Sequence, residues 1–268
     1  VIYAVGSGLL EVLGSPIVEA CPFEHKESVM SLLHSFYCWG SVGVVVVSTA
    51  FFAVFGIEHW KWLACLWALL PLYNTYNFAT CPIEPLVEEG KGMGIRGLLK
   101  VPVFWLAIVL MVCAGASELT MAQWASAYAE SAIGLSKTMG DLTGPCLFAA
   151  AMGISRVLYG KYGERIALTG FMLGSGLLCL ACYLMASLSG NPAIGLIGCI
   201  ACGFTAMFAL LAMAGDLGGA FGPSLAGAVS QRFGDNLQKG MLAGSVFPLV
   251  LVVCVLLLRL AQPEKGEA

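Results

Sequence analysis

Charged residues are scarce in this sequence of 268 residues. Asp, Glu, Lys and Arg make up 11% of it, whereas hydrophobic residues make up 59%. Soluble domains have about 25% charged and about 45–50% apolar residues. The shortage of charge excludes a soluble enzyme domain, a disordered regulator and a nucleic-acid-binding protein. The net charge of −3 indicates no particular partner.

Motifs of enzymes and metal sites are also missing. The sequence has no Ser/His/Asp order, no paired Asp motif and no His-Glu-x-x-His, so we expect neither catalytic residues nor a cofactor. The 11 cysteines, an odd number, lie almost all in apolar runs, which argues against a disulfide scaffold. Cys179-x2-Cys182 and Cys199-x2-Cys202 have the spacing of a zinc site, but thiolates are unfavourable in such apolar surroundings. We expect these cysteines to be small packing residues, and we expect no metal.

The features of a signal peptide are absent as well. The sequence begins at Val1 inside an apolar run, with no basic flank and no small-residue cleavage site. We expect it to be a fragment of a longer protein, cut at its N-terminus. The alternative is a signal anchor whose Met has been removed.

Long apolar runs dominate the rest of the sequence. A membrane-spanning helix needs about 20 predominantly apolar residues. Because the charged residues gather in short linkers between such runs, the pattern predicts an all-α, multi-pass bundle of helices in a lipid bilayer. The runs lie at 1–20, 29–55, 62–79, 101–129, 139–158, 165–188, 192–231 and 240–260.

One linker divides the chain. Residues 80–100 carry two prolines, four glycines and three bases, and they separate a first block, 1–79, from a second, 101–268. The bias of Lys and Arg predicts that this linker is cytoplasmic. The run at 192–231 is long for one span and short for two, so we expect two shortened spans there. Charge alone does not decide the side of the C-terminus.

Acidic residues inside the apolar runs are candidates for function. A carboxylate in a membrane span is unfavourable unless it is neutral, paired or facing water. Glu11 and Glu118 lie within runs, and we expect a functional role because the spans offer almost no Lys or Arg as a partner. A structural ion pair is the alternative. Asp141 and Asp216 lie near run ends, where we favour helix capping.

His34, Tyr37 and Trp39 lie within about one turn of a predicted helix. A single His on an apolar helix is usually a packing residue. Together with two aromatic neighbours it also fits the wall of a polar cavity, and both interpretations stay open.

Three of these segments resemble the major facilitator superfamily, nearest to its fucose-permease-like sugar symporters. The match around Glu118 is the most specific in spacing. The segments are Gly8-Leu9-Leu10-Glu11 with Ser15-Pro16, which resembles the fourth helix of that group; Leu32 to Gly40, which resembles the fifth; and Gly115-x2-Glu118-x5-Trp124-x3-Tyr128, which resembles the seventh.

Two weaker similarities concern gating and helix shape. Arg156, Lys161 and Arg165 resemble the basic loop between the eighth and ninth helices of the superfamily. Gly222 and Pro223 resemble the kink of the eleventh helix. The resemblance implies structural or gating roles for these five residues.

The resemblance implies a partial major facilitator fold. In it, 1–79 would be spans 4–6 of the N-terminal half, 80–100 the cytoplasmic linker, and 101–268 spans 7–12, with spans 10 and 11 shortened and spans 1–3 missing. It further implies a monomer with several spans in the plasma (inner) membrane.

The implied function is proton-coupled uptake of a sugar or similar small polar solute by alternating access. Glu11 first and Glu118 second would carry the proton. The solute would be bound by His34, Tyr37, Gln123 and Trp124, with Trp124 stacking on a sugar face. Trp124 also suits the interfacial aromatic belt of a membrane protein. The alternative function is that of a transporter-like membrane sensor or scaffold that moves no solute.

Overall fold

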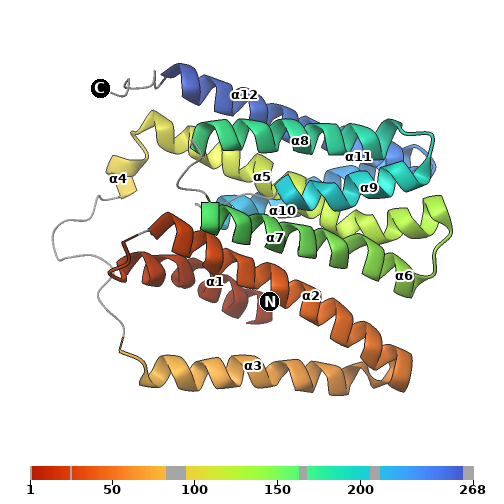
Figure 1. Cartoon of the computed structure of the whole chain (residues 1–268), viewed down its shortest axis with the longest axis horizontal. Helices are drawn as coiled ribbons and strands as arrows, with labels where there is room; N and C mark the ends of the chain where they lie inside the picture. Colours follow the sequence, from red (N-terminus) through yellow and green to blue (C-terminus); the bar gives the residue numbers. More distant parts are fainter. Residues whose placement is uncertain (1, 25, 83–94, 163–167, 206–211, 262–268) are drawn as a thin grey trace.

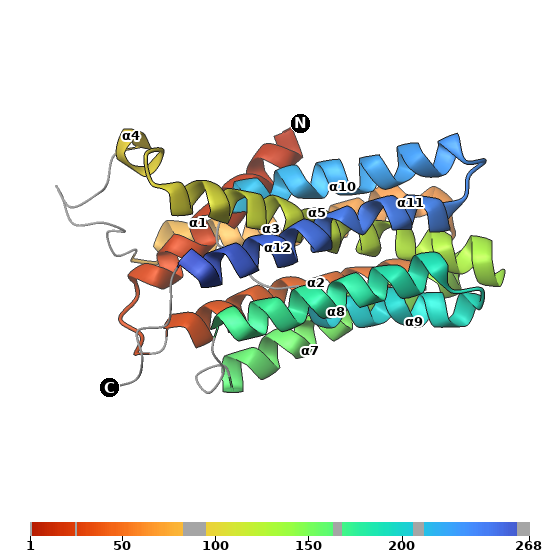
Figure 2. The same ribbon diagram turned by 90° about the horizontal axis from the view of Figure 1, so that it is seen from above.

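The structure is a bundle of helices (Figures 1 and 2). It is a computed structural model that describes residues 2–24, 26–82, 95–162, 168–205 and 212–261, and in these ranges it contains no strand. This confirms the all-α class. The α-helices are α1 (Ile2–Ala20), α2 (Lys26–Phe55), α3 (Trp60–Thr80), α4 (Ile95–Leu98), α5 (Pro102–Tyr128), α6 (Lys137–Asp141), α7 (Leu147–Tyr162), α8 (Leu168–Leu188), α9 (Pro192–Cys202), α10 (Ala212–Arg232), α11 (Leu237–Gly244) and α12 (Val246–Ala261).

Five of the described helical stretches are long and apolar enough to cross a membrane. A helix of about 20 residues spans the hydrocarbon layer and pairs its own backbone groups. Each of the five coincides with an apolar run of the sequence. They are Val29–Phe55, Pro102–Ile133, Lys137–Tyr162, Thr169–Leu188 and Leu237–Arg259.

The α5 stretch has recognisable signals at both ends. Pro102 lies in its first turn, where a backbone N–H would have no partner within the helix, so its absence costs no hydrogen bond. A π-helical turn, η2 (Ala129–Ile133), continues α5 and stops at Gly134. Gly134 has a φ of 76°, a left-handed conformation that favours glycine.

The helices before and after the segment 83–94 form two blocks, which we call the N-terminal block (α1–α3) and the C-terminal block (α5–α12). The contact between them is made mainly by α2 and α7 (Figure 1). Gly153 on α7 allows the close approach. A Cβ at this position would lie 3.1 Å from the Trp39 ring and 3.2 Å from Cβ of Cys38, both on α2.

Helix α3 lies at the edge of the structure. It contacts α2 and the short 3-10 helix η1 (Ile57–His59) (Figure 1). Leu63 is its single buried residue. The apolar side chains of α3 are therefore turned to the surroundings of the bundle.

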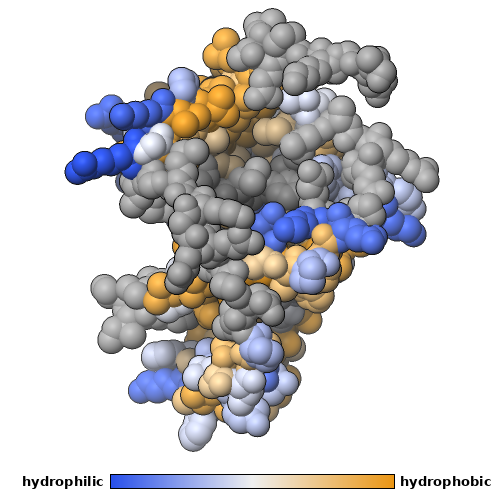
Figure 3. All heavy atoms as spheres, turned by 90° about the vertical axis from the view of Figure 1, so that its left-hand side faces the viewer, coloured by the Kyte–Doolittle hydropathy of each residue, from blue (hydrophilic) through white to orange (hydrophobic). Residues whose placement is uncertain are grey.

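The run 192–231 forms two helices that run in opposite directions (Figure 2). Helix α9 has 11 residues and continues as a 3-10 turn, η5 (Gly203–Thr205). Helix α10 has 21 residues. Helix α12 ends at the same end of the bundle as α4 (Figure 1). Figure 3 looks onto this end, where hydrophilic side chains lie in separate groups beside apolar ones.

Helices α5 and α10 pack backbone against backbone. A Cβ at Gly222 would lie 2.5 Å from the Ala116 carbonyl oxygen and from Thr120 Oγ1. A Cβ at Gly218 would overlap the Val112 carbonyl oxygen. Small residues at such positions let helices approach closely, which is how membrane helices gain packing energy. Pro223, predicted with Gly222 to kink a helix, lies buried inside α10.

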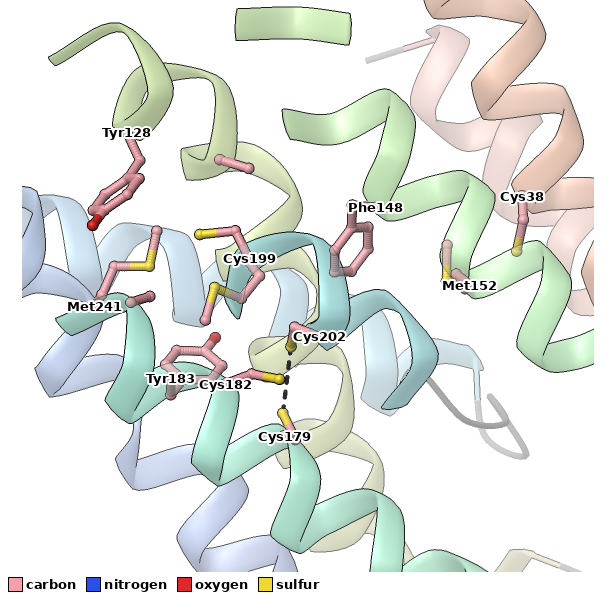
Figure 4. Packing of buried hydrophobic residues seen from close by; sticks show 13 residues of the cluster. Cys38, Tyr128, Phe148, Met152, Cys179, Cys182, Tyr183, Cys199, Cys202 and Met241 are labelled. Carbon is pink, nitrogen blue, oxygen red and sulfur yellow. Dashed lines mark hydrogen bonds between the residues drawn. The ribbon is translucent and has the colours of Figure 1, made fainter. Parts of the chain in front are cut away.

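The largest buried cluster lies between α5, α7, α8 and α9 and contains the four paired-spacing cysteines (Figure 4). Sγ of Cys179 and Sγ of Cys202 are 3.6 Å apart. Cys182 and Cys199 are buried beside them. In the described ranges no group of three or more His, Cys, Asp or Glu side chains is arranged to hold a metal ion.

Candidate functional site

A buried ion pair joins α5 and α7. Nη2 of Arg156 lies 3.7 Å from Oε2 of Glu118, and the side chains are 10% and 17% exposed. Glu118 is near the middle of α5, inside a candidate membrane span. A buried pair of this kind is stable only if both charges stay compensated, because either one alone is costly inside a protein.

The position of Arg156 corrects two expectations from the sequence. Arg156 belongs to the last two turns of α7, not to a loop, because the helix continues to Tyr162. It also supplies the cationic partner of Glu118 that the spans appeared to lack. The signal was present in the sequence, since an Arg beside an apolar run is a functional candidate in a membrane protein.

Arg156 also connects α7 to α2. Its Nη1 donates a hydrogen bond to the carbonyl oxygen of His34 over 3.1 Å. In return, the hydroxyl of Ser31 donates to the carbonyl oxygen of Arg156 over 2.8 Å. Sequence reasoning missed Ser31, because a serine in an apolar helix gives no signal until its partner is known. The Glu118–Arg156 pair thus lies where the two blocks meet.

The guanidinium of Arg156 is not fully satisfied. Its Nε is buried and has no hydrogen-bond partner. The distance of 3.7 Å to the Glu118 carboxylate is longer than a hydrogen bond between charged groups, which is about 2.7–2.9 Å. Arg156 therefore has N–H donors that are not used in a hydrogen bond.

The three α2 residues predicted to line a polar cavity, His34, Tyr37 and Trp39, have different surroundings. Nε2 of His34 lies 3.4 Å from Oγ of Ser15, so the His34 side chain is directed to α1 while its carbonyl meets Arg156. Tyr37 is 59% exposed. Trp39 packs its ring against Gly153. The structure therefore brings the His34 carbonyl oxygen and the Trp39 ring to the contact between the blocks, whereas the Tyr37 side chain is largely exposed.

The two predicted solute-binding residues that follow Glu118 also differ. Gln123 is exposed. Trp124 is partly buried and donates its indole N–H to the carbonyl oxygen of Pro223 over 3.1 Å. A Cβ at Gly227 would lie 2.8 Å from the Trp124 ring, so this side chain packs onto α10. Neither the stacking nor the belt interpretation included this contact.

Four further predicted residues have varied surroundings. Glu11 lies in α1, but its side chain lies outside the described part of the structure, and Arg165 lies outside it altogether. Lys161 is exposed at the end of α7, with Nζ 5.4 Å from the centre of the Tyr162 ring. Asp216 is exposed on α10.

Asp141 is not the helix cap that its position suggested, because its side chain caps no helix. It binds Nζ of Lys137 at 2.6 Å and accepts a hydrogen bond from Ser126 at 2.6 Å. Glu130 lies 3.3 Å from the same Lys137. Lys137 is four residues before Asp141, a spacing that places both on one helical face and could have revealed the pair.

Comparisons with known proteins agree with this architecture. The family model of the major facilitator superfamily matches residues 1–214. No curated protein sequence matches the chain. Among solved structures, a point variant of the E. coli fucose:proton symporter FucP superposes with a TM-score of 0.73 at 15% identity, covering 95% of this chain and 74% of that one.

The family match extends over most of the chain, and the superposition shows the shared fold. The predicted resemblance is thereby confirmed for the family and the fold. The chain belongs to the major facilitator superfamily of membrane transporters.

Proposed function

We propose that the protein is a secondary active transporter that takes up a small polar, sugar-like solute together with protons by alternating access. The observation that supports this most is the Glu118–Arg156 pair at the contact between the blocks. The likeness to the fold of a fucose:proton symporter agrees with the proposal.

The pair offers a physical link between a proton and a movement. Glu118 carries its charge inside an apolar span, where ionisable groups occur chiefly on ion and substrate pathways. When a proton neutralises the carboxylate, the attraction to Arg156 is lost. Since Arg156 also binds α2, this change alters the contact between the two blocks. A ligand that binds one arrangement better than the other shifts the equilibrium between them.

The other residues take secondary roles in this proposal. Glu11 is the first candidate for a further proton carrier. His34, Tyr37, Gln123 and Trp124 would contact the solute, and Arg156, Lys161, Arg165, Gly222 and Pro223 would shape the gate. Residues 1–79 would correspond to spans 4–6 and 101–268 to spans 7–12, in a monomer of the plasma membrane with 80–100 in the cytoplasm.

Proton uptake driven by solute tests the proposal. The protein is reconstituted into liposomes with a pH dye inside, and L-fucose, D-galactose and sodium gluconate are each added outside without a pH gradient. We expect at least one of them to acidify the lumen. Glu118→Gln should abolish it, because glutamine keeps the shape but carries no proton, while exchange of labelled solute continues.

Glu58→Gln is the matched control. Glu58 is 72% exposed and far along the chain from the pair, so this variant should acidify the lumen like the wild type. Normal acidification by Glu118→Gln would show that Glu118 is not the coupling group. Solute binding without any proton or solute movement in the wild type would favour the sensor.

A further inference from the structure

Arg156 is a buried cation whose hydrogen bonds are incompletely used. A guanidinium has five N–H donors in a planar fork that matches a carboxylate in two parallel bonds. Here one hydrogen bond reaches the His34 carbonyl, Nε has no partner, and the Glu118 carboxylate stays at 3.7 Å. The fork therefore keeps donors that a carboxylate closer than Glu118 would use.

The charge around this fork depends on Glu118. The titratable groups near the pair on neighbouring helices include His34 and Cys38 on α2 and Cys179 on α8. None of them is an acid that could replace the Glu118 carboxylate. The acidic side chain of α10, Asp216, is exposed.

Among the side chains that the structure describes, a proton on Glu118 thus leaves Arg156 buried without an acidic partner. Such a charge is strongly unfavourable and attracts an anion. Proton uptake by Glu118 and binding of an anion at Arg156 must then favour each other, because coupling between two sites is reciprocal.

We propose that the solute carries a carboxylate, which replaces Glu118 on the guanidinium of Arg156 when Glu118 takes up a proton. This inference rests on the proposed function and names its substrate class, a sugar acid such as an aldonate. One proton binds to a Glu118 carboxylate oxygen, the ion pair with Arg156 breaks, and the solute carboxylate accepts the freed N–H groups. One proton and one monoanion enter together, so no net charge moves.

Thermal unfolding of the purified protein tests the binding step. Sodium gluconate is the probe, D-glucose is the neutral analogue, and sodium chloride controls for ionic strength. We expect gluconate alone to raise the melting temperature, and more strongly in mildly acidic than in mildly alkaline buffer. The apparent affinity should change by up to about tenfold per pH unit, because one proton is taken up with the ligand.

Variants of the pair separate binding from folding. Glu118→Gln leaves the Arg156 charge unbalanced, so this variant should have a lower melting temperature than the wild type. Gluconate, but not glucose, should restore the melting temperature. The effect of gluconate should no longer depend on pH. The double variant Glu118→Gln with Arg156→Gln removes both charges, so it should fold and ignore gluconate. Glu58→Gln should respond like the wild type.

The inference is overturned if glucose stabilises the wild type as well as gluconate does, or if the double variant still responds to gluconate. It is also overturned if gluconate acts no more strongly than chloride. Failure of the proposed function looks different. If L-fucose and D-galactose drive proton uptake and gluconate does not bind, the proposed transport function is supported and the proposed carboxylate recognition is refuted. If gluconate binds as expected but no solute drives proton uptake, the carboxylate-binding site is supported and proton-coupled transport is refuted.

Discussion

The hydroxyl of Tyr183 donates a hydrogen bond to the carbonyl oxygen of Ser117 over 2.7 Å, directly beside Glu118 in the chain. Tyr183 lies on α8 and is completely buried. The bond joins α8 to α5 one residue before the ion pair. It therefore fixes the position of Glu118 along the α5 axis relative to α8.

Removing this hydroxyl should weaken the fold. Tyr183→Phe deletes one buried hydrogen bond, which contributes about 0.5–1.5 kcal/mol. We expect a lower melting temperature of the purified protein. Tyr73→Phe is the control, since Tyr73 is 64% exposed on α3 and this variant should melt like the wild type. Equal melting of both variants would contradict the anchoring role of Tyr183.

The glycines between α5 and α10 should not tolerate a methyl group. Gly222→Ala places a Cβ 2.5 Å from the carbonyl oxygen of Ala116, so the helices must separate. Overpacking of this kind costs about 1–3 kcal/mol. Gly170→Ala on α8 is the control, because its added Cβ meets no atom within 4 Å. Melting curves of the two variants should differ clearly, and coincident curves would refute the tight contact.

Trp124→Phe separates packing from solute binding. Loss of the indole N–H removes the hydrogen bond to the Pro223 carbonyl oxygen. The free energy of unfolding should fall by about 1 kcal/mol, and the melting temperature should fall with it. Trp62→Phe on α3, where the side chain is 71% exposed, should be neutral. The proposed contact with a sugar adds a second effect, a several-fold higher half-saturation concentration. Unchanged affinity with reduced stability would assign Trp124 to packing alone.

The orientation of the bundle can be tested with thiol labels. Lys100, between α4 and α5, and Asp235, between α10 and α11, are both exposed. These two connections lie at opposite ends of the bundle (Figure 2). If the linker 80–100 is cytoplasmic, Lys100→Cys in intact cells should resist a membrane-impermeant maleimide, whereas Asp235→Cys should react. Wild-type protein gives the background of the native cysteines. Rapid labelling at Lys100→Cys alone would reverse the orientation.

The helices were predictable because each span is encoded locally. Runs such as 29–55 and 101–129 are recognisable from their own composition, and they match α2 and α5 within a few residues. The partner of Glu118 was not predictable in this way. Arg156 lies 38 residues further along the chain, and only the packing of α5 beside α7 brings the two together. The contact of Trp124 was not predictable for the same reason, since its partner Pro223 follows 99 residues later.

The two kinds of helix contact differ in what they permit mechanically. Helices α5 and α10 approach each other backbone to backbone at Gly218 and Gly222, so they cannot slide past each other without a collision. Helices α2 and α7 are held by side-chain bonds of Ser31 and Arg156, which can break and form again. The first pair should move as one rigid body and the second should act as the sliding surface. Distances between spin labels should stay constant across α5 and α10 during a transport cycle and change across α2 and α7.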